Sequence, residues 1–122
     1  MKVLLGVGGS PDSLTALSQV VERASAVGDE LTVAVLDNPE TDVNIDDITD
    51  RVREELDRVG AEADIRTVSG DPGSRLVELA EAEGFDAIAL GGGEQTPMGK
   101  ISVGSIAEFV VLNARTSVFL IR

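Results

Sequence analysis

Short apolar runs alternate along the chain with stretches in which apolar residues recur every three or four positions. Residues 3–7 form a continuous apolar run, typical of a strand buried in a parallel sheet. Beyond them, Leu14, Leu17 and Ala24 share one face of a predicted helix. The same pattern predicts strands at residues 3–7, 31–36, 63–68, 86–90 and 117–121, and helices at 11–27, 48–59, 73–83 and 104–113.

Local signals mark the ends of these helices. Ser10 is expected to cap the first helix with its hydroxyl, Pro11 suits the first helical position, and Asp12 would face the positive end of the dipole. Gly28 is expected to end that helix. We interpret Asp71 as the start of a later helix rather than as an active-site carboxylate.

Strict alternation of strand and helix predicts an α/β fold with a parallel sheet covered by helices on both faces. We expect one domain, residues 1–122, built as a doubly wound, five-stranded, flavodoxin- or Rossmann-like sheet of order 3-2-1-4-5. This order puts the polar strand 63–68 at one edge. It also places the strands 3–7 and 86–90 at the switch point, where such sheets bind ligands beyond their carboxyl ends.

Both predicted strands at the switch point lead into glycine-rich loops. Glycines let a backbone approach a phosphate closely, and a helix N-terminus offers unpaired N–H groups. A flexible connection that needs glycine only for its turns explains the same residues, and Ser105 could simply serve the first turn of its helix. The candidate phosphate-binding residues are Gly8, Gly9, Ser10, Gly91, Gly92, Gly93, Gly104 and Ser105.

Composition narrows the possible chemistry. The 122 residues carry a net charge of -12, with no Cys, no His and 2% aromatic residues. These absences exclude Ser-His and Cys-His nucleophiles and the usual zinc sites, and we assign no catalytic residue and no metal ligand. Strong acidity disfavours nucleic acid as a partner. Without an apolar run of membrane length or a signal peptide, we expect a cytoplasmic protein and no membrane partner.

The acidic residues concentrate between positions 37 and 57. A solvated helix surface is the simplest interpretation, and an interaction face is the alternative. Acid excess with scarce lysine is also typical of proteins from halophiles, in which salt screens the self-repulsion. The run comprises Asp37, Glu40, Asp42, Asp46, Asp47, Asp50, Glu54, Glu55 and Asp57.

The last 32 residues, from Gly91 to Arg122, resemble the end of a universal stress protein. That family carries Gly, two residues, Gly, nine residues and then Gly-Ser or Gly-Thr, followed by a helix and a short apolar strand. Gly91 and the pair Gly104-Ser105 fit this motif, and residues 2–10 are similar to the family's first strand and loop. The resemblance implies an adenine nucleotide alpha hydrolase-like fold.

Two positions depart from the family pattern. Glu94 stands at the second motif glycine, and Gly8 stands where nucleotide-binding members have an acidic residue near the adenosine. Val35 falls where the family lines the adenine pocket. We therefore expect a stress-response binding module, regulatory through a protein partner, in which ATP binding is weak or lost and ATPase activity is weak at most. The alternative is an ATP-binding member, with Mg²⁺, that hydrolyses slowly or switches signalling.

The final strand carries a prediction about assembly. Residues Val118, Phe119, Leu120 and Ile121 are apolar on both alternating faces, yet the predicted order places them at a sheet edge. Apolar edges favour pairing with another chain. The resemblance likewise implies a homodimer formed through this strand.

Other proteins with related loops or the same topology fit the side chains poorly. The loop 8–13 lacks the leading serine of the adenylating enzymes' pyrophosphatase loop, a flavodoxin needs aromatic rings for its flavin, and a receiver domain needs acids after the first strand.

Overall fold

The computed structural model describes residues 1–37, 44–95, 101–102 and 104–122, with residues 94–95 and 101–102 described by their backbone. The strands are β1 (Lys2–Val7), β2 (Glu30–Leu36), β3 (Asp64–Val68), β4 (Ala87–Gly91), β5 (Glu94–Gln95), β6 (Ile101–Ser102) and β7 (Ser117–Ile121). The helices are α1 (Pro11–Val27), α2 (Ile45–Val59), α3 (Pro72–Ala82) and α4 (Ser105–Asn113).

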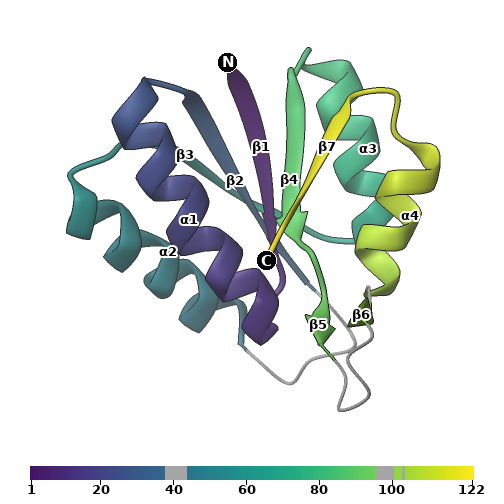
Figure 1. The fold of residues 1–122 in the computed structure, drawn as a ribbon, viewed down its shortest axis with the longest axis horizontal. Helices are drawn as coiled ribbons and strands as arrows, with labels where there is room; N and C mark the ends of the chain where they lie inside the picture. The colour runs from purple at the N-terminus through teal and green to yellow at the C-terminus, as the bar shows by residue number, and fades with distance from the viewer. Residues whose placement is uncertain (38–43, 96–100, 103) are drawn as a thin grey trace.

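The main sheet has five parallel strands in the order β3-β2-β1-β4-β7, which confirms the predicted 3-2-1-4-5 topology. Helices α1 and α2 pack on one face of the sheet and α3 and α4 on the other (Figure 1). The side chains of successive residues of β1 point to opposite faces of the sheet. Leu5 belongs to the core under α1 and α2, whereas Leu4 belongs to the core under α3 and α4.

Most predicted boundaries lie within one or two residues of those observed, and the largest shift is at α2. This helix begins at Ile45, not at residue 48, because the Asn44 side chain caps it by accepting a hydrogen bond from the Asp46 amide at 2.7 Å. Asp71 caps α3 in the same way, accepting from the Ser74 amide at 3.0 Å, so its interpretation as a helix start is confirmed.

Two predictions about local structure were wrong. The Ser10 hydroxyl occupies the N-cap position of α1 but makes no cap hydrogen bond. The glycine-rich segment after β4 was predicted to contain no strand, yet it contains the antiparallel pair β5–β6, with Glu94 opposite Ser102. Two-residue strands have too few positions to give an apolar alternation, so the sequence pattern carries no signal for them.

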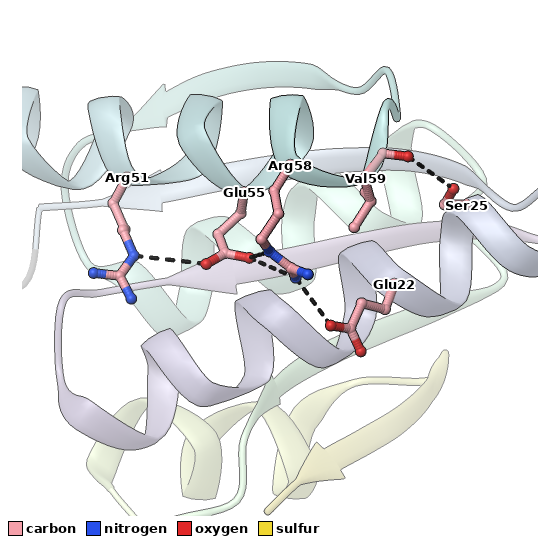
Figure 2. A network of polar contacts seen from close by, with 6 residues as sticks. All are labelled: Glu22, Ser25, Arg51, Glu55, Arg58 and Val59. Atoms are coloured by element: carbon pink, nitrogen blue, oxygen red, sulfur yellow. Dashed lines mark hydrogen bonds and ion pairs between the residues drawn. The ribbon is translucent and has the colours of Figure 1, made fainter.

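The described part of the acidic run lies on α2, except for Asp37, which is exposed in the loop after β2; Glu40 and Asp42 lie outside the described residues. In α2, the acidic side chains other than Glu55 are exposed. Figure 2 shows how α2 is joined to α1: Arg58 donates hydrogen bonds to Glu55 at 2.8 Å and to Glu22 of α1 at 2.9 Å. These hydrogen bonds, above all those that Arg58 donates to Glu55, raise the pKa of Arg58 above its ordinary value.

No helix within the described part of the chain is both long enough and apolar enough to cross a bilayer.

Candidate functional site

The predicted site lies where β1 and β4 end side by side. These two strands pair in parallel, with Leu5 opposite Ala89, so their carboxyl ends point toward the same edge of the sheet. Beyond that edge, the chain after β1 turns into α1, and the chain after β4 turns toward β5 (Figure 1). The two glycine-rich loops therefore meet at the switch point, as the sequence predicted.

A carboxylate joins the two loops. Asp12, in the first turn of α1, accepts a hydrogen bond from the Gly93 amide through Oδ2 at 3.0 Å. Its Oδ1 accepts from the Ser10 hydroxyl at 2.7 Å, which explains why that hydroxyl does not cap the helix. A Cβ atom at Gly91 would lie only 2.6 Å from Asp12 Oδ2 and 2.8 Å from the Asp12 carbonyl carbon. Gly91 is thus required by the close approach of Asp12.

The loop after β1 is fixed by its own contacts. The Gly8 amide donates to the Ser13 hydroxyl at 2.9 Å, and Ser13 is buried at the start of α1. Gly9 adopts a φ of 83°, a conformation that L side chains rarely adopt. Both glycines are buried. This half of the site therefore offers a compact backbone turn.

Two amides of the loop after β4 have partners within the protein. Gly92 donates to the Ile121 carbonyl at 2.7 Å, which continues the pairing with β7. Gly93, at a φ of 91°, donates to Asp12. A phosphate group at these two amides would therefore have to replace an existing hydrogen bond.

The start of α4 is more open. Gly104 is the N-cap residue, with a φ of -66°, and a Cβ atom there would have no neighbour within 4 Å among the described residues. Neither conformation nor packing requires glycine at this position. Ser105 begins the helix and is exposed. Figure 1 shows the start of α4 at the same end of the molecule as the loops after β1 and β4.

The remaining predicted binding residues are placed less favourably. Val35 is fully buried in the core under α1 and α2, in register with Val7 of β1, so a base could contact it only after rearrangement. Glu94 begins β5, and its side chain lies outside the described part of the structure. Lys100, which the sequence allows either as a phosphate contact or as an exposed loop lysine, also lies outside the described residues. The roles of Val35 and Glu94 stay predictions.

The predicted dimer strand, β7, lies at the edge of the sheet next to β4. Phe119 is 37% exposed, and Val118, Leu120 and Ile121 are half-buried. Nearby α4 exposes further apolar side chains, with Leu112 75% exposed. This side of the molecule therefore presents apolar surface.

The opposite end of the sheet holds an open, charged cleft of about 420 Å³. Its basic groups are already engaged: Arg66 forms hydrogen bonds with Asp64 and Glu83, and Lys2 donates to the Glu83 carbonyl at 2.6 Å. Lys2 Nζ also lies 4.5 Å from the centre of the Phe85 ring. Within the described ranges, no group of three or more carboxylates is arranged to hold a metal ion.

Among the described residues, Asp12 is a side chain at the site to which the sequence assigned no binding role. It was interpreted only as an acid near a helix N-terminus. The available signal was its position within the first turn after a switch-point strand, where a carboxylate can reach across to the neighbouring loop.

Comparison with known proteins identifies the family. The model of the universal stress protein family matches residues 1–122. The chain belongs to this family. Universal stress protein MJ0577 of Methanocaldococcus jannaschii is 30% identical over 73 residues, which cover 60% of this chain and 45% of that relative.

Solved structures of universal stress proteins share the fold. One, in complex with cAMP, has a TM-score of 0.77 and 26% identity, with 100% of this chain and 96% of that chain covered. Another, from Archaeoglobus fulgidus in complex with dAMP, has a TM-score of 0.74 and 20% identity, with 100% and 98% of the two chains covered. Each of these two universal stress proteins was thus solved with an adenine nucleotide.

Proposed function

We propose that this universal stress protein is a homodimeric, cytoplasmic regulatory module of the stress response that acts through a protein partner and binds ATP only weakly. The observation that supports the proposal is that two backbone amides of the loop after β4 already donate hydrogen bonds within the protein. The amides of Gly92 and Gly93 donate to Ile121 and Asp12, so they are not available to a phosphate without rearrangement. The buried turn at Gly8 adds no carboxylate for a ribose.

Charge supports weak ATP binding in the same way. Two like charges about 4 Å apart repel by roughly 4 kcal/mol at an effective dielectric near 20, which is on the order of a thousandfold in affinity. The dipole of a helix N-terminus contributes only about 0.3–2 kcal/mol. A carboxylate near the triphosphate, at Asp12 or Glu94, would therefore outweigh the dipole of α4. A Mg²⁺ ion bridging carboxylate and phosphates would reverse this balance.

A second function has its own support. Gly104 stands before α4 where no packing requires glycine, and the chain is 26% identical to a universal stress protein solved with cAMP. Both observations favour an adenine nucleotide site that hydrolyses slowly or switches signalling.

Two measurements decide between these functions. We expect the purified, undialysed protein to carry no nucleotide. We expect calorimetric titration to give weak ATP binding without Mg²⁺, and tighter binding by the Glu94→Gly variant, which restores the family glycine. Tight, metal-independent binding of ATP by the wild type would contradict the proposal and favour the second function.

A further inference from the structure

We propose that Asp12 is a built-in anion at the Gly93 amide and that it selects ligands at this site by their phosphate charge. The inference rests on the proposed function, because it assumes that this switch point is where the chain meets a nucleotide. It adds a residue to which neither the family motif nor the sequence pattern assigns a role in binding.

The geometry places the carboxylate where an anionic ligand would compete with it. Asp12 Oδ2 lies 3.0 Å from the Gly93 nitrogen, a normal hydrogen-bond distance, in the loop expected to contact phosphate. The Ser10 hydroxyl holds the other oxygen at 2.7 Å. Asp12 is half-buried, and the absence of a side chain at Gly91 lets it lie against β4.

The consequence depends on the charge that a ligand brings to this amide. Adenosine has no phosphate and leaves the Asp12–Gly93 hydrogen bond in place. Cyclic AMP carries a single negative charge, AMP carries more, and ATP carries the most. Repulsion from Asp12 therefore increases in that order. The wild type should prefer adenosine and cyclic AMP over ATP.

The amide variant Asp12→Asn separates charge from hydrogen bonding. Its side-chain oxygen can still accept from Gly93, so the contact between loops is retained while the negative charge is removed. Asp12→Ala removes both. Asp57→Asn is a matched control, because Asp57 is an exposed acid of α2 and this variant changes the net charge of the protein equally.

The experiment combines calorimetry with amide NMR. Affinities for adenosine, cyclic AMP, AMP and ATP are measured without metal for the wild type and the three variants. We expect Asp12→Asn to bind ATP tighter by about tenfold or more, inside the fivefold-to-thousandfold range set by one like charge at about 4 Å. Adenosine affinity should not change, and Asp57→Asn should behave as the wild type.

The NMR resonance of the Gly93 amide distinguishes this role from a purely structural one, because a structural role for Asp12 would not make the resonance respond to phosphate. Titration with inorganic phosphate or pyrophosphate should shift this resonance in Asp12→Asn and in Asp12→Ala, and leave it in place in the wild type.

The role of Asp12 is overturned if phosphate and pyrophosphate do not shift the Gly93 amide resonance in either Asp12 variant. It is also overturned if Asp12→Asn leaves the ratio of ATP affinity to adenosine affinity unchanged. Tight ATP binding by the wild type instead overturns the proposed weak affinity, while the ratio between variant and wild type still tests Asp12. The two proposals can therefore fail separately.

Discussion

The guanidinium of Arg66 on β3 donates hydrogen bonds to both carboxylate oxygens of Glu83, the residue that follows α3, with Nη2 2.8 Å from Oε1. Arg66 Nε also donates to Asp64, on its own strand, at 2.9 Å. The Glu83 carbonyl in turn accepts from Lys2 of β1. Glu83 thus connects the edge strand, a helix end and the first strand at the end of the sheet opposite the candidate site.

This contact predicts a pH-dependent stability. The hydrogen bond from Arg66 lowers the pKa of Glu83 below its ordinary value, so the unfolded chain binds the proton more readily than the folded protein. The contact therefore stabilises the fold above the unfolded pKa, and its contribution is lost as pH falls through the folded pKa. We expect Glu83→Gln to be less stable than the wild type at neutral pH and equally stable in strong acid, as measured by urea denaturation.

Glu81→Gln is the control for this comparison, because Glu81 is an exposed acid of α3, two residues before Glu83. It should follow the wild type at every pH. A stability difference between Glu83→Gln and wild type that persists in strong acid would show that packing, not ionisation, is responsible.

Alanine should change the free energy of unfolding very differently at two glycines of the candidate site. At Gly91, a Cβ would lie 2.8 Å from a backbone carbon of Asp12, which cannot move without shifting the start of α1. Overpacking of this kind costs about 1–3 kcal/mol, and we expect Gly91→Ala to lower the free energy of unfolding by that amount. At Gly104 the φ is -66° and the space is open, so Gly104→Ala should change it by less than about 1 kcal/mol. Chemical denaturation measures both, and equal losses would contradict the observed packing.

The sequence predicted the fold well because its main signals are local. Apolar runs marked the strands of the main sheet other than the polar β3, and Gly28 and Gly60, both in the left-handed conformation, end their helices as such residues commonly do. Right-handed crossovers then leave few possible strand orders. The start of α2 was placed at Ile48, three residues late, because the prediction used neither the Asn44 cap nor Ile45, the apolar residue that directly follows it.

The site was less predictable because its central contact is not local. Asp12 and Gly93 are 81 positions apart, and only the completed sheet brings them together. The pattern located both loops, since both follow switch-point strands. It could not show that the Ser10 hydroxyl binds Asp12 instead of capping α1, because a cap and a contact with a nearby carboxylate use the same residue type.

High salt should stabilise the protein if its acidity is an adaptation to salt. The net charge is -12, and α2 carries six acids against three arginines, with Asp47, Glu54 and Asp57 among its exposed acids. Raising ionic strength from 0.1 M to 1 M shortens the screening length from about 10 Å to about 3 Å. We expect the unfolding temperature to rise strongly between dilute buffer and molar KCl. A variant with Asp47, Glu54 and Asp57 changed to their amides should rise less, and a flat response of the wild type would contradict the halophile interpretation.

The edge strand β7 should mediate a two-fold dimer. Its outer side has no neighbouring strand in the described sheet, and Phe119 is 37% exposed on it, whereas the other edge, β3, carries Asp64 and Arg66. Two copies of β7 can pair antiparallel about a two-fold axis, each burying the other's apolar side chains. We expect light scattering at micromolar concentration to give twice the 12.7 kDa chain mass.

The mass should fall to that of one chain when Phe119 and Ile121 are replaced by Lys. Because Ile121 also packs against the core, Phe119→Lys alone is the sharper variant, with Leu112→Lys, on exposed α4, as its control. A monomeric wild type would refute dimerisation. If Phe119→Lys stays dimeric while Leu112→Lys dissociates, the dimer interface lies on α4 and not on β7.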